Sequence, residues 1–133
     1  MPRTATRTSW DIKPMPSSTT KLVFNRSFTN QEFALLSAGL IPKDMEDRWF
    51  IFMDGDWLYF HRSWSGFCVY QIRFEQEGEI YVVVKAIANR DPEQYRGTDN
   101  QYDADFIGFL IDDFLLGKRV PFPQRTLADD TSE

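Results

Sequence analysis

Three short turn signals between aromatic segments constrain the fold of this 133-residue chain most strongly. The dipeptides Asp54-Gly55, Ser65-Gly66 and Glu77-Gly78 separate segments rich in aromatic and β-branched residues. Asp-Gly is a favoured pair in two-residue hairpin loops of type I′, and none of these connections is long enough for a crossover helix. The chain is therefore predicted to form an antiparallel meander of four strands, with a positive φ at Gly55 and Gly78. The predicted strands comprise residues 49–53, 56–64, 67–75 and 80–88.

Helix signals precede this meander. Thr29 and Glu32 have the spacing of a capping box, in which each side chain accepts from the other residue's backbone amide. Gly39 is typical of a helix end, and Pro42 prevents the helix from continuing. A first helix is therefore predicted between Thr29 and Gly39, after a strand or extended segment at residues 22–28.

A second helix is expected to follow the meander and a polar loop at residues 89–100. It would begin near Asp103 as its N-cap and end before Gly117, because apolar residues recur at helical spacing between them. The predicted fold is α+β: a four- to five-stranded antiparallel meander sheet with two helices packed on one face. The helices are expected on the face that carries Phe50, Tyr59, Ile72 and Val83.

Composition divides the chain into three parts. Residues 1–20 are rich in Pro, Ser and Thr and are predicted to be a flexible N-terminal arm with Trp10 as an anchor. Residues 21–120 are predicted to form a single α+β domain, because the chain length suits one core. Residues 121–133 are predicted to be a disordered acidic tail.

Charge and cysteine content exclude several classes of protein. The formal net charge of −5 argues against a general nucleic-acid binder, which needs a basic surface. A single cysteine and a single histidine argue against a disulfide framework and a structural zinc site. No apolar run approaches the ~20 residues of a membrane span, and no signal peptide is recognisable. We therefore expect a cytoplasmic protein that uses no metal or cofactor and binds neither nucleic acid nor membrane.

The assumed register defines a candidate ligand-binding site. If every hairpin loop has two residues, Arg48, His61, Tyr70 and Lys85 form one row across the sheet, beside apolar rows and near the polar loop. Cationic groups flanked by rings suit an anionic or planar ligand. A solvated sheet edge is the alternative interpretation, and a longer turn at residues 63–66 would break the row.

Two further candidates lie on the other face, beside the turn. Arg62 stacked on Trp64 could bind a base or an ADP-like group, or could serve packing alone.

His61 is the candidate catalytic residue if the protein is an enzyme, because its ordinary pKa lies near neutrality; a hydrogen-bonded structural role is the alternative. Cys68 is expected to be a buried core thiol. The carboxylates around the second helix could hold Mg²⁺, but their spacing matches no known motif, and they are better interpreted as cap and solvated face. These carboxylates are Asp99, Asp103, Asp105, Asp112 and Asp113.

A resemblance accompanies these patterns. The segment Trp57-Leu58-Tyr59-Phe60-His61-Arg62-Ser63-Trp64-Ser65-Gly66 resembles a group of small, largely uncharacterised bacterial and phage-type proteins with a Trp-x-Tyr-Phe-His-Arg-Ser-Trp-Thr/Ser-Gly core. Such segments sometimes accompany ADP-ribose-processing domains. The resemblance implies nucleotide- or ADP-ribose-related biology and transfers no catalytic residue.

Three functions remain open from the sequence. The first is a small binding module for an anionic ligand, with a nucleotide or ADP-ribose moiety foremost. The second is a protein-interaction factor, such as an immunity, antitoxin or anti-defence protein, that acts by covering a partner. The third is a small hydrolase or transferase using His61, although no Gly-rich phosphate loop or triad spacing supports it. The sequence does not specify an oligomeric state.

Overall fold

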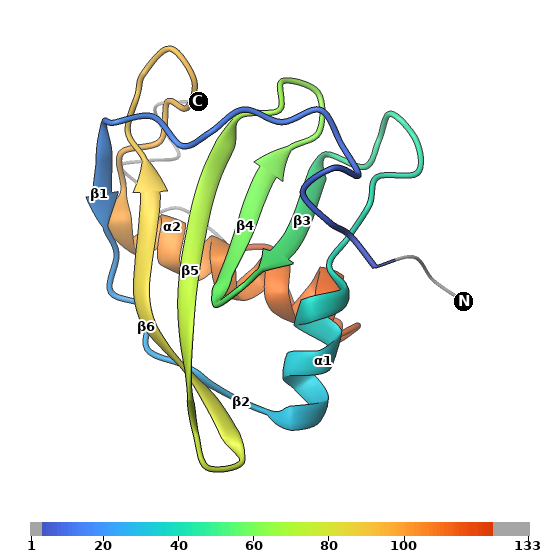
Figure 1. The fold of residues 1–133 in the computed structure, drawn as a ribbon. Coiled ribbons are helices and arrows are strands. Elements are labelled where there is room, and N and C mark those ends of the chain that lie inside the picture. The colour runs from blue at the N-terminus through green and yellow to red at the C-terminus, as the bar shows by residue number, and fades with distance from the viewer. Residues whose placement is uncertain (1–3, 124–133) are drawn as a thin grey trace.

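Six antiparallel strands form one sheet in the order β1-β6-β5-β4-β3, and β2 pairs with β6 off this path (Figure 1). The computed structural model describes residues 4–123. The strands are β1 (Thr19–Lys21), β2 (Ser27–Thr29), β3 (Trp49–Asp54), β4 (Trp57–Arg62), β5 (Cys68–Glu77) and β6 (Ile80–Asn89). Strands β3 to β6 form the predicted meander, so the α+β class and the antiparallel sheet are confirmed.

The strand count differs from the four to five expected. In place of one strand at residues 22–28, two short strands pair with β6: β1 ends just before this segment, and β2 begins within it at Ser27. β1 pairs with the end of β6 at Ile87–Asn89, whereas β2 pairs with its start at Ile80–Val82. Between them the chain keeps single contacts, from Leu22 N to Ala86 O and from Val83 N to Arg26 O, so the ladder is interrupted.

The first helix begins and ends as predicted. In α1 (Asn30–Ala38), Thr29 N donates to Glu32 Oε1 over 3.0 Å and Glu32 N donates to Thr29 Oγ1 over 3.1 Å, which completes the capping box. Gly39 follows with a φ of 69°. This positive φ explains why glycine ends the helix.

The second helix begins earlier than predicted. α2 (Asn100–Phe109) has Asp99 as its N-cap, and Asp99 Oδ1 accepts from Tyr102 N over 3.0 Å. A π-helical turn, η1 (Leu110–Leu115), continues it. The prediction that Asp103 is the cap was wrong, because that carboxylate is buried and accepts from tyrosine hydroxyls.

Both hairpin glycines have the predicted positive φ, 63° at Gly55 and 65° at Gly78. The loop residues are Gly55-Asp56 and Gly78-Glu79, because Asp54 pairs with Trp57 and Glu77 pairs with Ile80. No non-glycine residue in the described chain has a positive φ, so glycine alone takes that conformation, at the first loop position. This pattern is that of a type II′ turn and excludes the expected type I′.

A longer turn and a bulge then separate the predicted row. Residues 63–66 connect β4 to β5, and the register shifts between Phe60 and His61, so that Phe60 pairs with Tyr70 and His61 with Cys68. Because neighbouring residues of a strand point to opposite faces, His61 and Tyr70 lie on opposite sides of the sheet. Lys85 pairs with Arg73, so the predicted row of Arg48, His61, Tyr70 and Lys85 does not form.

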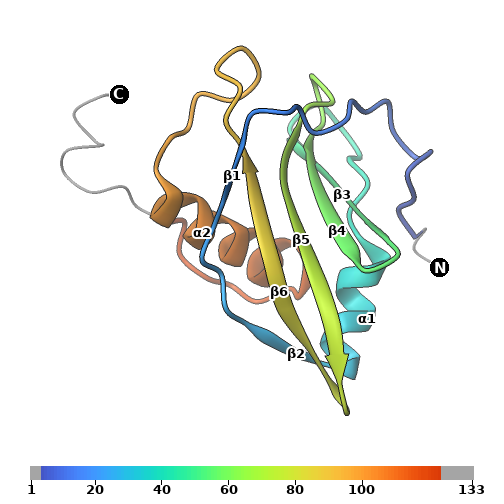
Figure 2. The ribbon, with the colours of Figure 1, turned by 60° about the vertical axis from the view of Figure 1, so that its left-hand side comes forward.

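The same change divides the residues of the predicted helix-covered face between the two sides of the sheet. The helices pack on the face that includes Trp49, Phe60 and Tyr70. Of the residues expected on this face, Ile72 and Val83 are part of the helix-covered core, whereas Phe50 and Tyr59 lie on the opposite face. Figure 2 shows α2 alongside one face of the sheet. The helix side chains buried in this core are Leu36, Ile107, Leu110, Ile111 and Leu115.

The opposite face is covered by the N-terminal arm, defined here as residues 4–18. Ala5 is buried with Phe50 and Phe52, and Trp10 stacks on Phe50 at a centroid distance of 6.1 Å. Arg7 forms an ion pair with Asp54 over 2.8 Å. The predicted acidic tail lies outside the described residues from position 124 onwards. Among the helices of the described chain, none is long and apolar enough to cross a membrane.

Candidate functional site

A pocket of about 370 Å³ lies beside the turn at residues 63–66, on the side of the sheet that faces α2. Three segments far apart in sequence build it: the residue before β3, the end of β4 with its turn, and the loop between β6 and α2. It contains three arginines and no acidic residue. The lining residues are Arg48, Arg62, Trp64, Ser65, Phe67, Gln94, Tyr95 and Arg96.

The three pocket arginines, Arg48, Arg62 and Arg96, have no carboxylate partner among residues 4–123. Elsewhere in this range the arginines are mostly paired with acidic side chains. The paired ones are Arg7 with Asp54, Arg26 with Asp112, Arg73 with Glu75 and Arg90 with Asp103. Three of the four arginines without a carboxylate partner in residues 4–123 therefore line one pocket, called the arginine pocket below, in a chain whose net charge is −5.

Aromatic rings orient two of these arginines. The guanidinium carbon of Arg48 lies 5.8 Å from the centre of the Trp64 ring, and that of Arg62 lies 5.2 Å from the centre of the Trp49 ring. Both distances suit cation–π attraction, which orders the guanidinium groups without neutralising them. The charges of Arg48 and Arg62 therefore remain available to an anion.

Trp64 presents its ring to solvent at the mouth of the pocket. Its side chain is 70% exposed, yet its position is fixed because Nε1 donates to the carbonyl oxygen of Met45 over 2.9 Å. A tethered, exposed indole can stack on a planar group at little conformational cost. Trp64 is thus suited to bind a ring next to the arginines.

Hydrogen bonds fix the turn relative to the start of β3. Ser63 N donates to Arg48 O over 2.8 Å, and Ser63 Oγ donates to Asp47 O over 2.7 Å. Gly66 N donates to Arg62 O over 2.9 Å, which closes the turn. The backbones that carry Arg48, Arg62 and Trp64 are therefore held together before any ligand binds.

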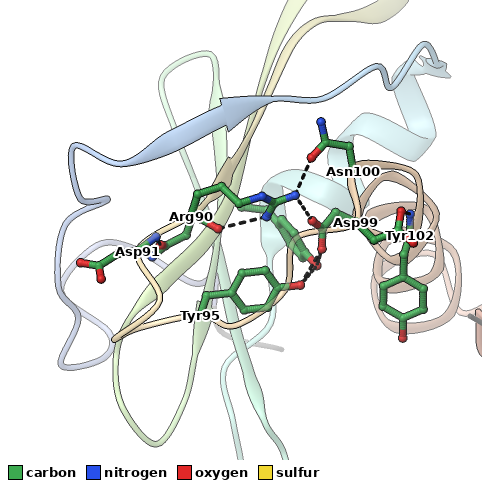
Figure 3. Close-up of polar contacts among 9 residues, drawn as sticks. Arg90, Asp91, Tyr95, Asp99, Asn100 and Tyr102 are labelled. Atoms are coloured by element: carbon green, nitrogen blue, oxygen red, sulfur yellow. Dashed lines mark hydrogen bonds and ion pairs between the residues drawn. The ribbon is translucent and has the colours of Figure 1, made fainter. Parts of the chain in front are cut away.

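A buried network fixes the loop that carries Tyr95 and Arg96 (Figure 3). Asp103 is 1% exposed and accepts from Tyr70 Oη over 2.8 Å, from Tyr95 Oη over 2.5 Å and from Arg90 Nη2 over 2.5 Å. Burial, above all, raises the pKa of both tyrosines, so they remain protonated donors. The network anchors the loop to α2, and Arg90 is committed to it.

The structure brings only some of the predicted site residues together. Arg48, Arg62 and Trp64 line the pocket. Tyr70 lies behind it, with its hydroxyl 3.1 Å from that of Tyr95. Lys85 is an exposed residue in the middle of β6, outside the pocket lining.

The polar loop contributes three residues to this pocket that were not among the predicted site residues. Gln94, Tyr95 and Arg96 complete its wall, and the length and polarity of the segment at 89–100 were the only signals for them. This loop lies beside the turn because Asp103 holds Tyr95 and Arg90. No local sequence pattern predicts these contacts.

His61 lies on the other side of the sheet, 2% exposed, under the arm. Its Nδ1 is 2.9 Å from the carbonyl oxygen of Gly66 and must carry the proton, because a carbonyl can only accept. Burial, the largest cause, lowers the pKa of His61, so the ring is neutral at pH 7. Its Nε2 has no hydrogen-bond partner in residues 4–123.

Cys68 is a buried thiol, as expected, and pairs with His61 across the strands. Burial raises the pKa of Cys68 to about 12, so it is not a thiolate at neutral pH. His61 and Cys68 both line a second cavity, of about 480 Å³, beneath the arm. Because the Cys68 thiol stays protonated, the two residues do not form an activated nucleophile–base pair.

The carboxylates near α2 serve as caps and ion-pair partners. Asp112 pairs with Arg26 over 2.5 Å, and Asp105 accepts from Gln101 over 3.0 Å on the helix surface. Within residues 4–123, no three His, Cys, Asp or Glu side chains are grouped so that they could hold a metal ion.

Comparisons with known protein families, with curated proteins and with solved structures found no match. The chemistry of the pocket is therefore the basis for assigning a function.

Proposed function

We propose that this protein is a small binding module for a phosphate-bearing ligand with a planar ring, namely a nucleotide or an ADP-ribose moiety. The observation that carries the proposal is the grouping of Arg48, Arg62 and Arg96, without carboxylate partners among the described residues, around a pocket with an exposed indole. Arginine forms charge-assisted and often bidentate hydrogen bonds with phosphate oxygens. Like charges so close repel one another, and an anion relieves that repulsion.

The ring of the ligand is assigned to Trp64. Stacking of a base on an aromatic side chain contributes about 1–3 kcal/mol and requires only an accessible ring face. Arg48 occupies one side of the indole, and the 70% exposure of the residue leaves contact area for a second planar group. Phosphate and base would thus be recognised by neighbouring but different side chains.

Binding is favoured over catalysis by the side chains of the pocket. Its lining contains no histidine, aspartate, glutamate, lysine or cysteine. These residue types supply most general acids, general bases and nucleophiles. His61, the candidate catalytic residue from the sequence, is on the opposite side of the sheet.

A protein-interaction role is the second candidate, and one observation favours it. Met45 is 74% exposed beside Trp64, whose indole donates to the Met45 carbonyl oxygen. Exposed apolar side chains next to cationic groups suit the surface of an acidic partner. In that case the arginines would contact carboxylates of a protein.

The test is isothermal titration of the full chain with ADP-ribose, ADP, inorganic pyrophosphate and adenosine. We expect ADP-ribose and ADP to bind, pyrophosphate to bind more weakly, and adenosine to bind weakest. Arg96→Gln should weaken ADP binding by about tenfold or more, because it removes one charge-assisted contact. Arg119→Gln is the matched control, since Arg119 is exposed, lacks a carboxylate partner in residues 4–123 and lies outside the pocket lining.

Absence of binding by all four compounds would reject the proposal and favour the interaction role. Equal weakening by both variants would show that binding reflects net charge and not this pocket.

A further inference from the structure

The turn at residues 63–66 has two sides, one facing the arginine pocket and one facing the N-terminal arm. We propose that residues 10–13 of the arm, together with His61, are positioning residues for the arginine pocket, so that ligand binding and seating of the arm are linked. This inference rests on the proposed function and adds its regulation.

Two hydrogen bonds join the arm to the turn. Trp10 Nε1 donates to Ser63 O over 2.8 Å, and Lys13 N donates to Gly66 O over 2.9 Å. The two acceptors are the first and last residues of the turn, and the pocket residues Trp64 and Ser65 lie between them. The arm therefore holds both ends of the segment that carries the indole.

The arm also approaches the turn closely at Gly66. A Cβ atom on Gly66 would lie 2.6 Å from Asp11 O and 3.2 Å from Ile12 Cα. Gly66 has a φ of 78°, which only glycine adopts easily. The turn thus has the one residue type that allows the arm to pass at this distance.

His61 supports the turn from the same side. Its protonated Nδ1 donates to Gly66 O, the oxygen that also accepts from Lys13 N. Both lone pairs of this carbonyl are used, so its orientation is fixed by two donors. His61 is therefore assigned a positioning role, which accounts for a buried histidine that does not reach the pocket.

The arm crosses the end of the sheet where the turn lies, as both ribbon views show (Figures 1 and 2). If the arm leaves the turn, the carbonyls of Ser63 and Gly66 lose the donors Trp10 Nε1 and Lys13 N, and the turn that carries Trp64 is held by fewer hydrogen bonds. A ligand that needs the fixed turn binds the seated state better than the released state. By thermodynamic reciprocity it then stabilises the seated arm to the same extent.

The experiment uses Trp10→Phe in the full chain. This change removes the Nε1 donor but keeps a ring that can stack on Phe50. Trp57→Phe is the matched control, because Trp57 is at the other end of β4. It takes no part in the hydrogen bonds between the arm and the turn, and it does not line the pocket. The measurements are the ADP dissociation constant by titration and the amide hydrogen exchange of Lys13 and Gly66.

We expect Trp10→Phe to weaken ADP binding about fivefold, the equivalent of one net hydrogen bond. Exchange at Lys13 and Gly66 should become faster in this variant, whereas Trp57→Phe should change neither quantity. Saturating ADP should slow exchange of the Lys13 amide in the wild-type protein.

Two results would overturn the inference while the proposed function stands: wild-type and Trp10→Phe proteins that bind ADP equally, or a Lys13 amide whose exchange ADP does not alter. A wild-type protein that binds neither ADP, ADP-ribose nor pyrophosphate would overturn the proposed function itself, and the linkage with it.

Discussion

At the scale of single residues, the environment of a polar side chain decides its role. Asp103 was predicted to cap the second helix, and Asp99 lies four positions before it in the sequence. Asp99 is the cap, and Asp103 is the buried acceptor for Tyr70, Tyr95 and Arg90. The capping box of Thr29 could be predicted, because it depends on residues three positions apart. The role of Asp103 could not, because its donors come from distant segments.

His61 yields a prediction about the pH dependence of stability. Burial lowers its pKa in the folded state below the ordinary value of 6.5. As pH falls through 6.5, the unfolded chain takes up a proton that the folded protein does not, so unfolding becomes more favourable. The stabilising contribution of neutral His61 is therefore fully present above pH 6.5 and declines as pH falls towards the folded-state pKa.

The check is urea denaturation of wild-type and His61→Gln proteins between pH 5 and 8. The free-energy difference between them should shrink as pH decreases, because only the wild type carries this titrating group. A difference that stays constant across the range would show that His61 titrates alike in both states. The comparison cancels the pH dependence of the carboxylates that both proteins share.

At the scale of elements, glycines mark the turns in the sequence but do not specify the turn type. Asp54-Gly55 and Gly55-Asp56 are both acceptable loops, and the choice between them shifts which side chains face one another. Positive φ at Gly55 was predicted and is present. The register was wrong, because the chain uses type II′ turns and a β-bulge beside His61.

Two glycine substitutions separate backbone strain from close packing. Gly55 and Gly66 have similar φ values, 63° and 78°. A Cβ atom added at Gly55 would meet nothing within 4 Å, whereas one added at Gly66 would meet the backbone of Asp11 and Ile12. Gly55→Ala should therefore cost about 1 kcal/mol of stability, from backbone conformation alone. Gly66→Ala should cost roughly 1–3 kcal/mol more, because the arm must also move.

Thermal or urea unfolding of the two variants tests this difference. Equal destabilisation would contradict the close approach of the arm to the turn. A loss of ADP affinity in Gly66→Ala, and none in Gly55→Ala, would connect that approach to the pocket.

At the scale of the whole molecule, the pocket depends on which face of the sheet each segment occupies. Arg62 and Trp64 were predicted on the face opposite His61, and the structure places them in the pocket on the side away from the arm. Arg96 joins them only because the loop before α2 is anchored by Asp103. A one-residue change of register between β4 and β5 exchanges the two faces. The kinds of residue in the site could thus be predicted from the sequence, but which individual residues line the pocket could not.

The arm and the helices cover opposite faces of one sheet. The composition of residues 1–20 suggested flexibility, yet Ala5, Trp10 and Ile12 pack on Phe50 and Phe52, and Arg7 pairs with Asp54. These contacts join residues separated by about forty positions or more, so local composition does not reveal them.

Binding of a phosphate-bearing ligand in the arginine pocket can be followed at the site itself by NMR of arginine Nε–H and tryptophan Nε1–H groups during ADP titration. We predict saturable shifts for Arg48, Arg62, Arg96 and Trp64, with little change for the ion-paired Arg7, Arg26 and Arg73. Shifts confined to other arginines, or no shift in any of these groups at millimolar ADP, would contradict binding in this pocket.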